Sequence, residues 1–194
     1  MPKLWNETVA EHREAVREAA LDAAGTLVAA RGLASVTMSA IAAKAGIGRA
    51  TLYKYFPEVE AVLVAWHKRQ IGMHLGHLVA VRDAAGSPGE RLAAVLAAYA
   101  TMSWRHGDGD LAALLHRGAH VARAEKQLVR FIRDLVAEGA VAGEIRTDMT
   151  PEELASFCLH ALGAAADLTS KAAVLRLVRL TVAALARPGP AGRR

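Results

Sequence analysis

The sequence predicts an all-α protein, and three observations lead to that fold class. Alanine and leucine dominate the 194 residues, while β-branched and aromatic residues are modest, which favours helix over strand. The internal prolines Pro57, Pro88 and Pro151 stand where helices could begin, because proline suits a first helical turn and damages a helix interior. Apolar residues recur at the three- and four-residue spacings of helices. With 53% apolar residues the chain can bury a substantial core.

About nine helices are expected along the chain. Val16, Ala20 and Leu27 share one face of a first helix over 10–31, and Gly32 is placed to end it. Thr37 can cap a short second helix, and a third short helix runs from 49 to 56. Thr150 followed by Pro151 and two acids is a typical helix start. The remaining helices are predicted over 57–81, 90–105, 110–119, 121–139, 150–168 and 171–186.

The distribution of charge is compatible with nucleic acid as a partner. The formal net charge is +5 and the isoelectric point is near 9.7. No acidic residue occurs from Ala23 to Pro57, whereas this stretch contains Arg31, Lys44, Arg49 and Lys54. Acidic residues crowd the segment just before it. A basic stretch of this kind is a weak indication of nucleic-acid binding by itself.

Several classes of protein are disfavoured by the sequence. Uncharged runs are too short to cross a membrane, which takes about 20 apolar residues. The N-terminus lacks the pattern of a signal peptide, so a cytoplasmic protein is expected. The single cysteine, Cys158, is incompatible with an internal disulfide or a cysteine-rich zinc site. No cofactor is predicted.

The stretch 37–56 carries the strongest functional indication, two short helices joined by a glycine-containing turn in a helix-turn-helix arrangement. Ala42 and Ala45 are small enough for close approach of the two helices. Gly46 can adopt the positive φ of a tight turn. The apolar residues expected to face inward are Ile41, Ile47, Leu52 and Phe56. The residues left outward on the second helix suit base edges and phosphates, and they are Arg49, Ala50, Thr51, Tyr53, Lys54 and Tyr55.

The same stretch, with Gly32-Leu33 before it and Pro57 after it, resembles the N-terminal domain of the TetR family of bacterial transcriptional regulators. The matching pieces are Thr37, Ile41-Ala42, Ala45-Gly46, Thr51-Leu52-Tyr53 and Tyr55-Phe56. The resemblance covers about a third of the chain. It implies a helical homodimer with a three-helix DNA-binding domain over 1–56, an effector-binding and dimerisation domain over 57–187, and a basic tail over 188–194.

By matching position, the resemblance implies roles for individual residues. Thr37 and Ser39 would touch phosphates, Lys44 would lie near the DNA backbone, and the recognition helix would face the bases. The full DNA-binding set is Thr37, Ser39, Lys44, Gly48, Arg49, Ala50, Thr51, Tyr53, Lys54 and Tyr55. Two positions depart from the family pattern. Gly48 stands where the family usually has serine or threonine, so the recognition helix loses a side-chain cap. Val59 stands where a lysine commonly contacts the DNA backbone.

The C-terminal two-thirds offer candidates for two further sites. A stripe on each of the last two helices suits a dimer interface, formed by Phe157, Ala161, Leu162, Ala165, Leu175, Val178, Val182 and Leu185. Ordinary core packing is the alternative reading of both stripes.

The candidates for an effector site are aromatic and polar residues that suit a largely apolar ligand: Trp66, Tyr99, Met102, Ser103, Trp104, His116, His120 and Phe131. Simple core packing is again the alternative.

Two histidine pairs, His74 with His77 and His116 with His120, have spacings that share a helix face. Neither pair has a cysteine or carboxylate at a ligating spacing, so no metal site is predicted.

The leading hypothesis is a regulator, most simply a repressor, that binds a palindromic operator in double-stranded DNA and is released by a small molecule. The alternatives are an all-helical enzyme or carrier for apolar molecules, and a protein-interaction module. No nucleophile–base pair supports an enzyme.

Overall fold

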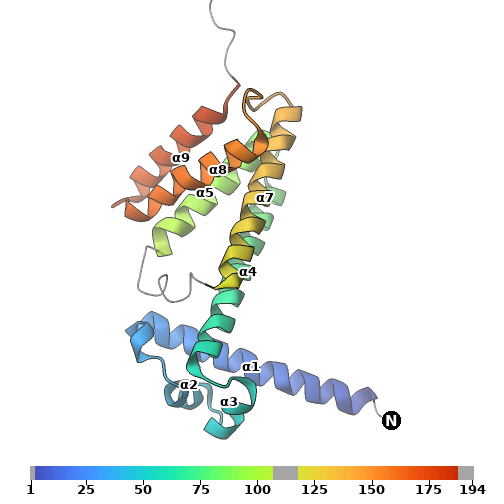
Figure 1. Ribbon diagram of the computed structural model, residues 1–194, viewed down its shortest axis with the longest axis vertical. Coiled ribbons are helices and arrows are strands. Elements are labelled where there is room, and N and C mark those ends of the chain that lie inside the picture. The colour runs from blue at the N-terminus through green and yellow to red at the C-terminus, as the bar shows by residue number, and fades with distance from the viewer. Residues whose placement is uncertain (1–2, 107–117, 188–194) are drawn as a thin grey trace, which may run out of the picture. The chain divides into compact units, whose positions relative to one another are not determined.

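The computed structural model describes residues 3–106 and 118–187, apart from the side chains of residues 3–10, Ala34 and His106 (Figure 1). Eight α-helices and two short 3-10 helices make up these residues, and they contain no β-strand beyond one isolated bridge between Ile145 and Ala186. This confirms the predicted all-α class. None of the described helices is long and apolar enough to cross a membrane. The chain divides into two compact units, Met1–Gly72 and Met73–Arg194.

The N-terminal unit is built on one long helix. This helix, α1, spans Lys3–Arg31 and is followed by a 3-10 turn, η1, at Leu33–Ser35. Two short helices come next, α2 at Met38–Ala45 and α3 at Arg49–Tyr55. The start of α4, which spans Val59–Ala84, completes the unit. Its core consists of Val16, Ala20, Leu21, Ala23, Ala24, Val36, Met38, Ile41, Ala42, Leu52, Phe56, Val62, Leu63 and Trp66.

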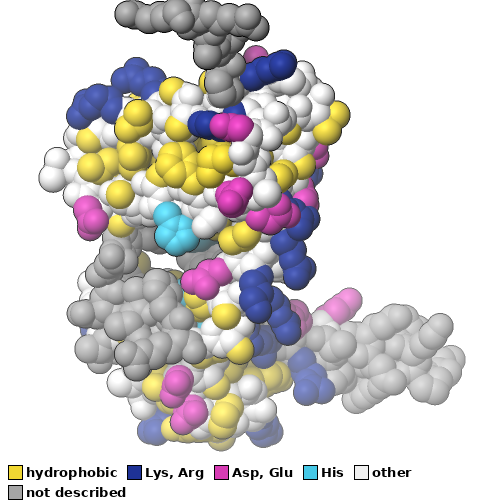
Figure 2. All heavy atoms as spheres, turned by 45° about the horizontal axis from the view of Figure 1, so that its top comes forward, with side chains coloured by type: hydrophobic (Ala, Val, Ile, Leu, Met, Phe, Trp, Pro, Cys, Tyr) yellow, Lys and Arg dark blue, Asp and Glu magenta, His cyan; other side chains and the backbone are white. Residues whose placement is uncertain are grey.

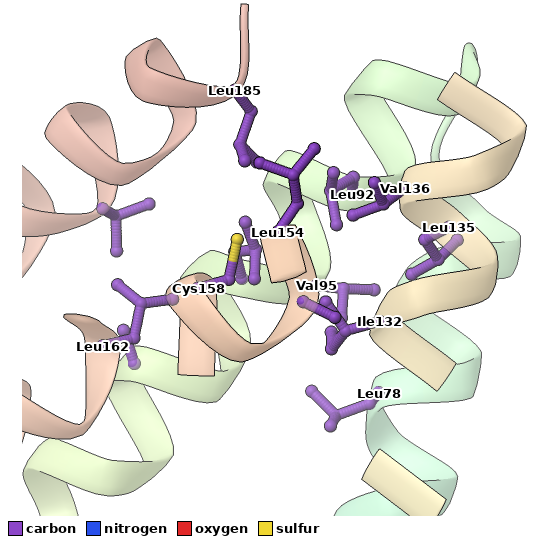
Figure 3. Close-up of a cluster of buried hydrophobic side chains, with 14 of the residues drawn as sticks. Leu78, Leu92, Val95, Ile132, Leu135, Val136, Leu154, Cys158, Leu162 and Leu185 are labelled. Atoms are coloured by element: carbon purple, nitrogen blue, oxygen red, sulfur yellow. The ribbon is translucent and has the colours of Figure 1, made fainter. Parts of the chain in front are cut away.

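The C-terminal unit is a helical bundle. It contains the end of α4 together with α5 at Pro88–His106, α7 at Ala119–Val141, α8 at Pro151–Gly163, a 3-10 turn η2 at Ala164–Asp167, and α9 at Lys171–Leu185. Leucine, isoleucine and valine side chains from these α-helices converge on a single apolar core (Figure 3). Leu92, Ile132 and Leu162 are among its fully buried members. Burial of this core holds the bundle together, because apolar area removed from water is the main stabilising contribution to folding.

Local signals placed several helix ends correctly. Thr150 caps α8 in a capping box: the Glu153 N–H donates to the Thr150 hydroxyl at 3.2 Å, and the Thr150 N–H donates to the Glu153 carboxylate at 2.8 Å. Pro151 occupies the first turn of that helix, as predicted.

Other boundaries differ from the predictions. Pro57 does not open α4, which begins two residues later at Val59. The proline instead favours extended backbone in the residue before it, and Phe56 lies at φ −136° and ψ 116°, which ends α3. Helix α8 ends at Gly163 and tightens into η2 rather than continuing to residue 168. The helix predicted over 110–119 lies almost wholly outside the described residues.

Candidate nucleic-acid interface

The turn between α2 and α3 is fixed by backbone geometry at its glycine. Thr37 caps the start of α2 by accepting a hydrogen bond from the Ala40 N–H at 3.1 Å. The helix ends at Gly46, which adopts the left-handed conformation with φ 68° and ψ 28°. The N–H of Ile47 then donates to the Ala42 carbonyl at 3.0 Å. A residue with a side chain is strained in this conformation, so Gly46 sets the angle at which α3 leaves the turn.

The inward faces of α2 and α3 are apolar and well buried. Ile41 and Leu52 are completely buried, while Ala42 and Phe56 each expose 2% of their surface. Three of the four residues predicted to face inward are therefore in the core, and the fourth, Ile47, is half-buried. Within α3 itself only Leu52 is buried. The recognition helix is thus attached along one narrow edge and presents its other sides outward.

The predicted DNA-binding residues occupy the outward side of this motif. Exposed residues of α3 and its flanks carry a guanidinium, a methyl group, a phenol and an ammonium group, and half-buried Thr51 and Tyr55 border them. The set contains hydrogen-bond donors and acceptors for base edges and cations for phosphates. The exposed members are Thr37, Ser39, Lys44, Gly48, Arg49, Ala50, Tyr53 and Lys54.

The start of α3 lacks a side-chain cap, as the departure at Gly48 predicted. Gly48 has the extended conformation of an ordinary N-cap residue, at φ −67° and ψ 141°. A Cβ built on it would lie 3.6 Å from the Thr51 hydroxyl oxygen, which is an ordinary van der Waals contact. The site therefore has room for a serine or threonine. Glycine leaves the first N–H groups of the recognition helix without a side-chain acceptor.

The structure shows three contacts of α1 that were not predicted from the sequence. The Arg17 guanidinium lies over the Phe56 ring at 5.1 Å from its centroid. One residue further on, Glu18 accepts a hydrogen bond from Arg69 of α4 at 2.5 Å, and Asp22 accepts a second from Arg69 at 2.6 Å. The acidic segment that precedes the basic stretch is therefore partly used to hold the start of α4 against α1. Carboxylates spaced four residues apart were the only signal of this contact in the sequence.

The candidate effector residues divide between the two units. Tyr99, Met102, Ser103 and Trp104 lie on α5, and Phe131 lies on α7; all five are partly buried in the C-terminal unit. The Trp104 indole N–H donates to the Leu168 carbonyl at 2.7 Å, and Arg82 covers the Phe131 ring at 5.5 Å. His120 is half-buried near the start of α7.

Two candidates fall elsewhere. Trp66 belongs to the N-terminal unit, where it is buried beside Gly25 of α1. His116 lies outside the described residues. The structure therefore groups six of the eight candidates on α5 and α7, while their role in effector binding remains a prediction.

The candidate dimer residues also divide into two groups. Leu162, Ala165, Val178 and Leu185 are buried within their own bundle, and Ala161 and Val182 are half-buried. Phe157 and Leu175 are exposed, at 42% and 43%, and a further leucine, Leu180, is 69% exposed. On the face toward the viewer in Figure 2, the C-terminal unit shows hydrophobic side chains gathered together with Lys and Arg at their margin. Among these residues, the exposed members are the ones most available to a second copy.

The described His, Cys, Asp and Glu side chains can be compared with the arrangements that bind metal ions or act as nucleophiles. Over the residues that can be described, no three His, Cys, Asp or Glu side chains are arranged to hold a metal ion. Cys158 is fully buried in the C-terminal core, and this burial raises the pKa of its thiol to about 12. A thiol with so high a pKa is an inert, hydrophobic side chain at neutral pH.

Comparison with known proteins agrees with this geometry. Residues 20–65, which span the end of α1, both short helices and the start of α4, match the sequence model of the family described as bacterial regulatory proteins, tetR family. The HTH-type transcriptional regulator BetI of Rhizobium meliloti (strain 1021) is 35% identical over 96 residues. That alignment covers 50% of this chain and 44% of BetI, so the chain matches less than half the length of this curated relative.

Solved structures share the fold over nearly the whole chain. A TetR/AcrR-family regulator from Thermobifida fusca YX-ER1 has a TM-score of 0.74 and 23% identity, with 92% of this chain and 98% of that chain covered. AibR, solved in complex with isovaleryl coenzyme A and operator DNA, has a TM-score of 0.63 and 20% identity, with 90% and 100% covered.

These observations identify the N-terminal unit as a helix-turn-helix domain of the kind that binds DNA. In that domain the chain is similar to the bacterial regulatory proteins of the tetR family.

Proposed function

We propose that this protein is a transcriptional regulator that binds a palindromic operator in double-stranded DNA as a homodimer. The observation that carries the proposal is the outward side of α3, where Arg49, Ala50, Tyr53 and Lys54 are exposed on a helix anchored by Leu52. The sequence around this helix contains no acidic residue from Ala23 to Pro57, so no carboxylate there would repel DNA phosphates. A short helix of this kind can enter the major groove, where its side chains meet base edges and its cations meet phosphates.

Dimerisation follows from the same geometry. One recognition helix reads only a few base pairs, whereas two related by a twofold axis read a palindrome with half-sites about one DNA turn apart or a multiple of it. Phe157, Leu175 and Leu180 supply exposed apolar surface on α8 and α9. Burial of that surface against a second copy would remove it from water.

We further propose that a small effector binds in the C-terminal unit and releases the DNA, which makes the protein a repressor. The partly buried side chains Tyr99, Met102 and Phe131 lie on α5 and α7 and suit a largely apolar ligand. AibR was solved with an acyl coenzyme A, so acyl-CoA thioesters are the first effectors to test. Release requires only that the ligand bind more tightly to the form of the protein with low DNA affinity. Catalysis has no part in this function.

The experiment begins with selection of a DNA duplex by the full-length wild-type protein from a random-sequence pool. Binding of that duplex is then measured against salt concentration for wild type, Lys54→Ala and Lys126→Ala, which removes an exposed lysine from α7. We expect Lys54→Ala to weaken binding and to reduce the salt dependence by about one released counterion per subunit. Lys126→Ala should bind like wild type. Equal affinity of all three proteins, or failure of the selection to enrich any sequence, would refute the proposal.

A further inference from the structure

The recognition helix has little to hold it in a single orientation. Helix α3 has seven residues, which is far below the length of about 12 to 15 at which an isolated helix becomes marginally stable. It has no side-chain cap at its first turn, and Leu52 is its only buried residue. Its direction therefore depends on the Gly46 turn before it and on what is attached at its C-terminal end.

That end is attached through Phe56. Phe56 exposes 2% of its surface, and its N–H donates to the Leu52 carbonyl at 3.0 Å, so it forms the C-cap of α3. Lys54 and Tyr55 immediately precede it and move with it. A displacement of Phe56 in its site would change the tilt of α3, because Leu52 and the Gly46 turn are the other attachments of this short helix.

Arg17 covers this ring from α1. Its guanidinium is 5.1 Å from the ring centroid, inside the range of about 6 Å over which a cation is attracted to an aromatic face. Arg17 is half-buried, so neighbouring atoms partly shield this contact from water. The adjacent Glu18 already accepts a hydrogen bond from Arg69 of α4. Helix α1 thus holds the end of α3 with one side chain and the start of α4 with the next.

We infer that Arg17 is a positioning residue for DNA recognition: by covering Phe56 it fixes the orientation of the recognition helix, and it acts on DNA specificity through that helix. This inference rests on the proposed DNA-binding function. A positioning role for Arg17 would affect binding differently from a phosphate contact. A phosphate contact contributes equally to the affinity for any DNA sequence and adds to the salt dependence of binding. A positioning residue raises the affinity for the preferred sequence above that for other sequences.

The test uses the selected duplex and a duplex of scrambled sequence, with full-length wild type, Arg17→Met, Arg17→Lys and Arg13→Met. Arg13 is exposed one turn earlier on α1, so Arg13→Met makes the same change of charge without the ring contact. We expect Arg17→Met to lose about twofold to fivefold in affinity for the selected duplex per subunit, relative to Arg13→Met. Affinity for the scrambled duplex should be the same for both variants. Arg17→Lys keeps a cation over the ring and should recover part of the loss.

Three results would overturn the inference. Equal binding of the selected duplex by Arg17→Met and Arg13→Met would show that the ring contact has no effect on recognition. A salt dependence lower by about one counterion per subunit in Arg17→Met than in Arg13→Met would make Arg17 a direct phosphate contact. Equal losses on both duplexes together with a lower melting temperature would show a purely structural role. If the selection itself enriches nothing, the proposed function fails rather than this inference.

Discussion

Substitution of Gly25 by alanine tests how closely α1 and α4 pack in the N-terminal unit. Gly25 lies in the interior of α1, where alanine normally stabilises a helix by about 1 kcal/mol relative to glycine. A Cβ at this position, however, would lie 2.6 Å from Nε1 of Trp66 and 3.4 Å from two further indole atoms. The Trp66 side chain is buried, with 8% of its surface exposed, so it cannot move aside without disturbing its neighbours.

The matched control is Gly72→Ala in α4. Gly72 is also inside a helix of the same compact unit, but a Cβ there would have no atom within 4 Å. The helix-propensity gain is common to both substitutions and cancels in the comparison. The difference is the cost of overpacking, typically about 1 to 3 kcal/mol. We therefore expect Gly72→Ala to be stabilised and Gly25→Ala to be less stable than Gly72→Ala by about 1 to 3 kcal/mol.

Equilibrium unfolding in urea, followed by circular dichroism, measures both free energies. Tryptophan fluorescence of Gly25→Ala should also change in the folded state, because the indole of Trp66 must move. Equal stabilisation of Gly25→Ala and Gly72→Ala, with unchanged fluorescence of Gly25→Ala, would show that Trp66 does not obstruct a side chain at position 25.

Two further predictions concern the C-terminal unit. Hydrogen bonds from the Thr150 backbone N–H and hydroxyl lower the pKa of Glu153 below its ordinary 4.5, so the charged carboxylate stabilises the folded state above pH 4.5 and this contribution is lost as the pH falls through the lowered pKa. The difference in unfolding free energy between wild type and Glu153→Gln, measured from pH 7 to pH 2, should therefore shrink only in the acid range. A difference that stays constant with pH would contradict the capping box. Phe157→Glu places a charge on the exposed apolar surface of α8 and should shift the protein from dimer to monomer, as measured by light scattering. The control Ser156→Glu, at the neighbouring exposed position, should leave the dimer intact. If both variants remain dimers, the dimer interface lies elsewhere.

Features that depend on residues a few positions apart could be predicted from the sequence. The Thr37 and Thr150 caps and the left-handed Gly46 each involve backbone groups within four residues, so the residue types alone indicate them. The outward and inward sides of α2 and α3 follow from helical periodicity in the same way. The exposed and buried sides of the candidate interface could therefore be predicted from the sequence.

Features that depend on long-range packing could not be predicted. Periodicity shows that α9 has apolar residues on more than one side, but it cannot show which side its own bundle covers. The structure buries Val178 and Leu185 and leaves Leu175 and Leu180 exposed. The contact of Arg17 with Phe56 likewise joins segments far apart in the chain, and no local pattern marks it.

The proposed function requires that the outward side of α3 lie against DNA, and cleavage of the DNA by a tethered reagent tests this requirement. An iron chelate attached to Ala50→Cys would generate radicals within a short distance of the recognition helix. Cys158 is buried with a raised thiol pKa, so it should not react with the label in the folded protein. Lys126→Cys, at an exposed position of α7, is the control. We expect cuts at two symmetric positions in the selected duplex from residue 50 and none from residue 126. A bound complex that is cut from residue 126 but not from residue 50 would contradict the proposed placement of α3 on DNA.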